Sequence, residues 1–160
     1  MAVFTKSILP FLILIHLTSF LPGQKVTLLK IDALEKRLAG GKDTTYIINF
    51  WATWCKPCVE ELPEFEKLNS EYKNEKLKVL LISVDYKSQF TSSVIPFVNK
   101  KKLKSEVFLL DEPDQQEYID RIDSSWSGSI PASLFVKNNK RKFSEKQFTY
   151  EELKTAFQTF

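Results

Sequence analysis

The sequence predicts a single α/β domain, and three observations support this fold class. Residues 46–51 form a β-branched and aromatic run typical of a buried central strand. Residues 57–72 show helical spacing of apolar side chains, and residues 77–84 are a second apolar strand. This order indicates a parallel pair joined by a right-handed crossover. The 160 residues, 43% of them hydrophobic, suffice for one core and contain neither repeats nor a low-complexity linker.

The other elements follow from local patterns. Asp32 is placed to cap the first helix. We expect a strand within 25–30, a helix over 31–38, a break at 40–43, a helix over 94–103, a strand over 106–110, a helix over 115–122, a loop over 124–129, a hairpin from 133–137 and 141–145, and a helix over 150–160. The side chains predicted to be in the core include Leu34, Leu38, Phe65, Leu68, Leu81, Phe97 and Phe135.

The first 23 residues differ in composition from the rest. Lys6 is their only charged residue, and the apolar run over residues 8–21 is typical of a secretory signal peptide. The cleavage site is not clear, so an uncleaved membrane anchor remains an alternative, although this run is short for a span and contains Pro10. We expect a leader over residues 1–23, a domain over 24–160, and export to the periplasm or another extracytoplasmic space.

Composition excludes several functions. The net charge of +3 comes from nearly balanced charged residues, so we expect no nucleic-acid partner. The single histidine, His16, lies in the leader. The predicted domain therefore has no imidazole for a serine-type or cysteine-protease-type triad.

Cys55 and Cys58 are the only cysteines. A structural disulfide this short would remove little chain entropy. A zinc site needs about four ligands, and haem attachment needs a histidine where Val59 stands, so we expect neither a metal nor a cofactor. Redox exchange is the remaining interpretation.

The spacing assigns a role to each cysteine. Cys55 falls at a helix N-terminus, where free amides and the helix dipole favour a thiolate, the species that attacks a disulfide. Cys58 lies about one turn further along on the same side, where it can resolve the mixed disulfide. Pro57 is tolerated in a first helical turn, and Lys56 adds a positive charge nearby.

Residues 50–58, Phe-Trp-Ala-Thr-Trp-Cys-Lys-Pro-Cys, resemble the active-site segment of the thioredoxin superfamily, and more narrowly that of TlpA/ResA-type exported thiol-disulfide oxidoreductases. The resemblance implies a thioredoxin-like fold with a central mixed sheet flanked by helices. It also implies that Ile130-Pro131 forms the loop opposite the cysteines with a cis proline. The backbone of Ile130 would then be free to pair with an extended substrate segment.

The resemblance also directs attention to Glu61. Thioredoxins carry a buried acid at the position of Asn49, which cannot take a proton. TlpA/ResA-type proteins carry a glutamate three residues after the second cysteine, the position of Glu61, and the resemblance assigns it to proton handling. A buried carboxyl with a raised pKa would suit that task, whereas Glu60 points elsewhere.

Three tryptophans complete the set of candidates. Trp51 and Trp54 are predicted to pack around the cysteines, with Trp54 contacting substrate together with Lys56, Pro57, Ile130 and Pro131. Trp126 could line the same face or pack in the core.

The leading hypothesis is a monomeric dithiol reductant of protein disulfides. By resemblance its client is apocytochrome c and a membrane protein donates its electrons. An oxidant that forms disulfides is an alternative, because no sequence rule fixes the direction. A redox sensor or peptide-binding module is another. A thiol peroxidase would need an arginine beside its cysteine, and Arg37, Arg121 and Arg141 are all distant from the motif.

Overall fold

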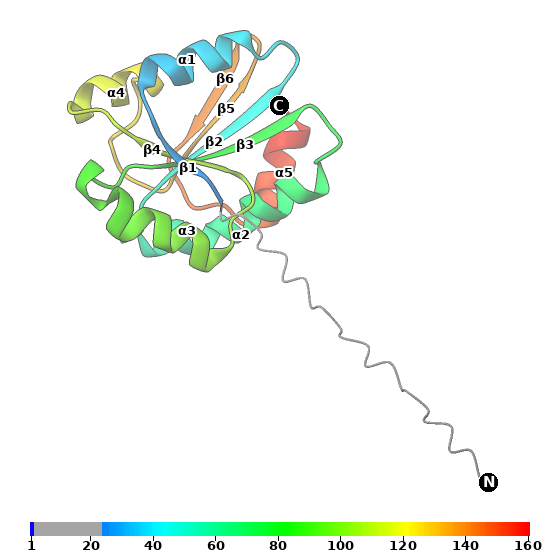
Figure 1. Ribbon diagram of the computed structural model, residues 1–160. Helices are drawn as coiled ribbons and strands as arrows, with labels where there is room; N and C mark the ends of the chain where they lie inside the picture. Colours follow the sequence, from blue (N-terminus) through cyan, green and yellow to red (C-terminus); the bar gives the residue numbers. More distant parts are fainter. Residues whose placement is uncertain (2–23) are drawn as a thin grey trace.

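In the computed structural model, which describes Met1 and residues 24–160, helices and strands alternate through most of the chain (Figure 1). The strands are β1 (Val26–Leu29), β2 (Thr45–Trp51), β3 (Leu77–Ser83), β4 (Glu106–Leu110), β5 (Ala132–Lys137) and β6 (Lys140–Ser144). The helices are α1 (Ile31–Gly40), α2 (Lys56–Glu71), α3 (Ile95–Lys101), α4 (Gln115–Ile122) and α5 (Tyr150–Gln158). A short 3₁₀ helix, η1 (Lys87–Gln89), and a short π-helix, η2 (Phe90–Val94), lead into α3.

The strands form one mixed sheet in the order β1-β4-β3-β2-β5-β6. Strands β1, β4, β3 and β2 pair in parallel, whereas β5 runs antiparallel to β2 and β6 antiparallel to β5. β2 is therefore central, and all seven of its residues are buried. The predicted parallel pair of β2 and β3 and the predicted hairpin of β5 and β6 are both confirmed.

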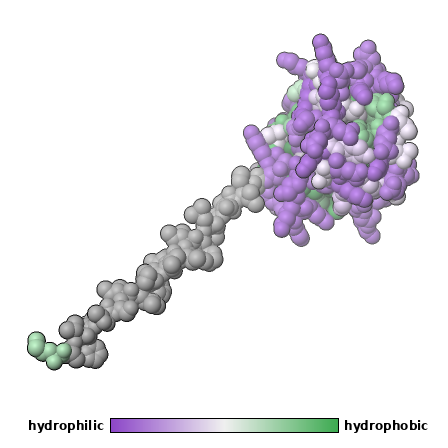
Figure 2. Space-filling model, turned by 90° about the vertical axis from the view of Figure 1, so that its right-hand side faces the viewer, coloured by the Kyte–Doolittle hydropathy of each residue, from purple (hydrophilic) through white to green (hydrophobic). Residues whose placement is uncertain are grey.

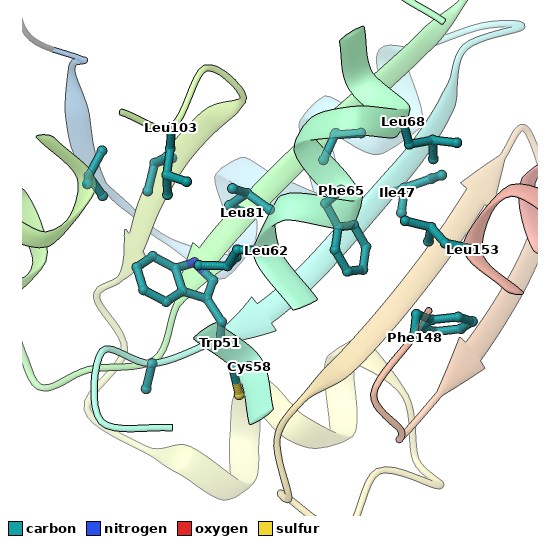
Figure 3. Close-up of a cluster of buried hydrophobic side chains, with 14 of the residues drawn as sticks. Ile47, Trp51, Cys58, Leu62, Phe65, Leu68, Leu81, Leu103, Phe148 and Leu153 are labelled. Atoms are coloured by element: carbon teal, nitrogen blue, oxygen red, sulfur yellow. The ribbon is translucent and has the colours of Figure 1, made fainter. Parts of the chain in front are cut away.

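Helices cover both faces of the sheet (Figure 1). On one face, α1 and α4 pack against Ile48 and Phe50 of β2. On the other face, α2, α3 and α5 pack against Ile47 and Trp51, the alternate residues of the same strand. Figure 3 shows this second cluster, with Cys58 at one end of it. Both cysteines therefore belong to this buried cluster.

One face of the molecule is mostly polar. The face seen in Figure 2 is covered largely by hydrophilic residues, with small hydrophobic areas between them. The two edge strands are also protected: β1 has four residues, and β6 presents the exposed cations Lys140, Arg141 and Lys142.

Some sequence expectations need correction. Asp32 is not the cap of α1: the N-cap is Lys30, which makes no side-chain cap, and the amide of Ile31 donates to Glu112 Oε1 at 2.7 Å instead. Phe97 is only partly buried, at the edge of the core beside Trp51.

The predicted leader lies outside the described residues, apart from Met1. Within the described part of the chain, we find no helix whose length and apolar character would let it cross a membrane.

A matched pair of substitutions tests the position of the core. Leu81 on β3 is fully buried, whereas Leu28 on the edge strand β1 is 41% exposed. We expect Leu81→Ala to lower the free energy of unfolding by about 2–5 kcal/mol, because it leaves a cavity. Leu28→Ala should change it by less than about 1 kcal/mol. Urea denaturation of both variants measures the difference, and equal losses would contradict the packing described above.

Candidate active site

The cysteine pair lies where β2 ends and α2 begins. Cys55 is the N-cap residue of α2 and forms a disulfide with Cys58, with 5.3 Å between the two Cα atoms. Cys58 is fully buried, and Cys55 keeps 5% of its surface accessible. The predicted difference in depth is therefore present, although it is small in this oxidised form.

The local electrostatics at Cys55 favour a negative charge. The backbone N–H of Cys58 donates to Cys55 Sγ at 3.3 Å, as expected for a sulfur that occupies the N-cap position. Pro57 lies in the first turn of the helix, as predicted. The ammonium group of Lys56 is 3.8 Å from the carboxylate of Glu60 and its side chain is 87% exposed. We therefore expect the helix end to stabilise a thiolate more than Lys56 does.

The loop that faces the disulfide contains the predicted cis peptide bond between Ile130 and Pro131. Pro131 is buried and Ile130 is half-buried. The carbonyl oxygen of Ile130 lies 3.8 Å from Cys55 Sγ. A disulfide sulfur carries no proton, so this is a contact in the oxidised form and becomes a possible hydrogen bond only when Cys55 is a thiol.

Glu61 lies on α2 three residues after Cys58, and both side chains are buried, so they occupy the same side of the helix. Only 1% of Glu61 is exposed. Burial raises the pKa of Glu61 to about 7, although hydrogen bonds from the Phe148 amide and from Asn49 act in the opposite direction. Its predicted burial is confirmed, and it can gain or lose a proton near neutral pH.

Asn49 holds this carboxyl from the strand side. Its Nδ2 donates to Glu61 Oε1 at 2.7 Å and to Ser133 Oγ at 3.3 Å, while the amide of Phe148 donates to Glu61 Oε2 at 2.7 Å. Within the described residues, Asn49 Oδ1 is buried without a hydrogen-bond partner. The position at which thioredoxins keep their acid is therefore occupied here by a residue that orients the acid of α2.

Sequence reasoning missed a second buried carboxylate, that of Asp85. It accepts hydrogen bonds from Thr53 N at 2.9 Å, Thr53 Oγ1 at 2.6 Å and Ser83 Oγ at 2.7 Å. These bonds tie the turn before Cys55 to the end of β3. Its place directly after a buried parallel strand was the available signal, because functional groups gather at that edge of α/β sheets.

The three tryptophans occupy different environments. Trp51 is fully buried, as predicted for a packing residue. Trp54 is 63% exposed and lies outside the buried core, and its contact with substrate stays a prediction. Trp126 is buried against Phe50 and Tyr118, on the α1 and α4 face of the sheet. It belongs to the core, which decides between the two alternatives for this residue.

This fold, with a cysteine pair at disulfide distance where the central strand meets a helix, defines a thioredoxin-like domain. A sequence profile described as the AhpC/TSA family matches residues 22–141. The chain therefore belongs to the AhpC/TSA family.

Named relatives agree with this class. The chain is 34% identical to the thiol-disulfide oxidoreductase ResA of Bacillus thuringiensis over 115 residues, which are 72% of this chain and 60% of that protein. It is 41% identical to the thioredoxin-like protein YneN of Bacillus subtilis over 54 residues, 34% of this chain and 30% of that protein. These matches span less than two thirds of either relative.

Solved structures share the fold. A thiol:disulfide interchange protein of Chlorobium tepidum superposes with a TM-score of 0.62 at 20% identity, covering 76% of this chain and 82% of that chain. StoA of Bacillus subtilis superposes with a TM-score of 0.55 at 23% identity, covering 71% and 82%. The mixed sheet with flanking helices that the resemblance implied is confirmed.

The raised pKa of Glu61 predicts a pH-dependent stability. The folded protein favours the neutral carboxyl, so its stabilising contribution is present below about pH 4.5 and is lost as the pH rises through about 7. Over this pH range the free energy of unfolding should fall by on the order of 3 kcal/mol. We expect urea denaturation of the oxidised protein between pH 5 and 8 to show wild type losing stability relative to Glu61→Gln as the pH rises.

Glutamine fits this site because its oxygen can accept from Phe148 and its amide can donate to Asn49 Oδ1 once the asparagine side chain turns. Glu60→Gln is the matched control, since the Glu60 side chain is 53% exposed and its substitution leaves the buried carboxyl of Glu61 in place. This variant should lose stability with rising pH as wild type does. A constant difference between wild type and Glu61→Gln across this pH range would contradict the assigned pKa.

The geometry also predicts which thiol reacts first. In the reduced protein we expect iodoacetamide to label Cys55 before Cys58, because Cys55 has the helix N-terminus and the accessible surface. Peptide mapping by mass spectrometry measures the label on each residue. Preferential labelling of Cys58 would reverse the assigned roles.

Proposed function

We propose that this protein is an exported thiol-disulfide oxidoreductase that reduces disulfides in other proteins. The observation that carries the proposal is the Cys55–Cys58 disulfide at the N-terminus of α2, with the carboxyl of Glu61 buried on the same side of the helix. Relatives named thiol-disulfide oxidoreductases support the same activity.

The reaction proceeds in two exchanges. The thiolate of Cys55 attacks one sulfur of the client disulfide, which breaks that bond, forms a mixed disulfide and releases the other client sulfur as a thiolate. The thiolate of Cys58 then attacks Cys55 Sγ, which releases the second client thiol and leaves the Cys55–Cys58 disulfide. Two electrons pass to the client. A membrane electron donor then supplies two further electrons, which reduce the Cys55–Cys58 disulfide again.

Glu61 serves the second exchange. Cys58 is buried, so its thiol has poor access to bulk water as a proton acceptor. A carboxylate with a pKa of about 7 accepts that proton near neutral pH, and Asn49 and the Phe148 amide fix its orientation. Side chains three residues apart on one helix are neighbours, so we expect Glu61→Gln to change the cysteine titration of the reduced protein.

The direction proposed is reduction. The dipeptide Lys56-Pro57 and the isoleucine before Pro131 favour a reductant. For a reductant we expect a reduction potential of about −270 mV, the value of thioredoxin. A strong oxidant would have a reduction potential of about −120 mV. Equilibration with glutathione or dithiothreitol buffers measures this quantity, and a value near the second figure would make the protein a disulfide-forming oxidant.

The proposed location is outside the cytoplasm, as indicated by the composition of residues 1–23. We propose that the protein acts as a monomer. Its proposed clients are proteins with exposed disulfides, including apocytochrome c. The proposed reduction of clients distinguishes the protein from a peptide-binding module of the same fold.

The contacts of the arginines argue against a thiol peroxidase, which would need an arginine beside its cysteine. Arg37 pairs with Glu106 and Arg121 pairs with Asp32 and Glu35, at N–O distances of 2.5–2.8 Å. Arg141 donates to the carbonyl oxygen of Ile122 at 2.7 Å. Each of the three arginines therefore has a partner other than the cysteines.

One assay tests the activity and the roles together. In insulin reduction with dithiothreitol as the electron source, we expect Cys55→Ser to fall to the uncatalysed rate. Glu61→Gln should slow exchange roughly tenfold, and Glu60→Gln should match wild type. Cys58→Ala should accumulate mixed disulfides, and mass spectrometry of these adducts identifies the clients. Wild-type activity in Cys55→Ser would refute the proposed function.

A further inference from the structure

A cleft of about 360 Å³ lies beside the disulfide, at the carboxyl ends of β3 and β4. Its lining includes Trp54 and Ile130 of the candidate active site and Tyr86 from the loop after β3. Its size is at the low end of the range for ligand pockets, about 300–1,000 Å³, so it suits one or two side chains.

Two exposed aromatic side chains line the cleft. Among the residues that the structure describes, the exposed large hydrophobic side chains are Met1, Leu28, Trp54 and Tyr86. Trp54 and Tyr86, exposed by 63% and 78%, both line this one cleft. Single exposed apolar residues need no explanation, but two aromatic rings at one cleft indicate a binding site.

The two aromatic residues are held by a common anchor. Asp85, next to Tyr86 in the chain, accepts both hydrogen bonds from Thr53, next to Trp54. The amide of Tyr86 in turn donates to Gln89 Oε1 at 3.1 Å. These bonds hold the backbone next to both aromatic residues before a ligand binds, which lowers the entropy cost of binding.

The carboxylates that line the cleft already have hydrogen-bond donors, and those of Asp85 come from Thr53 and Ser83. Asp111 accepts from Lys87 Nζ at 2.9 Å. Glu112 accepts from the amide of Ile31 at 2.7 Å and lies 3.7 Å from Lys30 Nζ. Because these carboxylates are paired, the cleft favours a neutral ligand over a charged one.

We infer that the cleft binds an aromatic side chain of the client, located two residues before or after the client cysteine that Cys55 attacks. This inference rests on the proposed function. An extended client segment paired with the backbone of Ile130 would carry its neighbouring side chains toward the cleft, because Ile130 contacts Cys55 and also lines the cleft. Trp54 and Tyr86 then select clients by the residue beside the disulfide.

Peptide probes test this selection. Each probe carries one cysteine in a mixed disulfide with 5-thio-2-nitrobenzoate, and a variable residue, Phe, Ala, Glu or Lys, two positions before or after it. The rate of chromophore release by the reduced protein gives a second-order rate constant. We expect one of the two Phe peptides to react about fivefold to tenfold faster than its Ala counterpart, and the charged peptides to show no such gain.

Variants assign the preference to the cleft. Tyr86→Ala should reduce the Phe-to-Ala ratio to about twofold or less, whereas Tyr86→Phe, which keeps the ring, should retain it. Leu28→Ala, which removes an exposed hydrophobic side chain elsewhere, should behave as wild type. Circular dichroism confirms that each variant is folded.

The outcomes separate the two proposals. Release by wild type no faster than by Cys55→Ser would refute the proposed function itself. Active protein with equal rates for Phe and Ala peptides at both positions, or faster reaction of a charged peptide, would overturn only the cleft assignment. A Phe preference that survives in Tyr86→Ala would also overturn it.

Discussion

The buried carboxyl of Glu61 connects three distant parts of the chain. It projects from α2, receives a hydrogen bond from Asn49 on the central strand, and receives another from the amide of Phe148 just before α5. An ionised carboxylate in such a place is costly unless it is hydrogen-bonded, and here both of its oxygens have donors. The compromise between burial and these bonds places its pKa near neutrality, where proton exchange is useful.

The position of β2 explains why the site is largely shielded from solvent. The strand lies inside the sheet with helices on both faces, so the chain emerges from the core only at its end, and Cys55 follows four residues later. The turn between them is held from the side by Asp85. The reactive sulfur is thus placed by one strand, one helix and one buried carboxylate.

The sequence predicted the features that depend on local pattern. The apolar run of β2, the helical spacing of α2 and the position of Glu61 one turn after Cys58 are all periodic signals. Contacts between distant segments were not predictable in this way. The Phe148 amide is 87 residues from Glu61, and Asp85 is 32 residues from Thr53. The cap assigned to Asp32 was wrong for the same reason, since Glu112, 81 residues away from Ile31, supplies the acceptor.

The cations along β6 have a consequence for self-association. A protein that captures extended segments must avoid offering its own sheet edges to other copies, because open edges seed polymerisation. Here β6 exposes Lys140, Arg141 and Lys142 in succession, so two such edges brought together would repel each other, and β1 is too short to extend a ladder far. The proposed pairing of a client segment with the backbone of Ile130 would therefore not compete with strand pairing between copies of the chain.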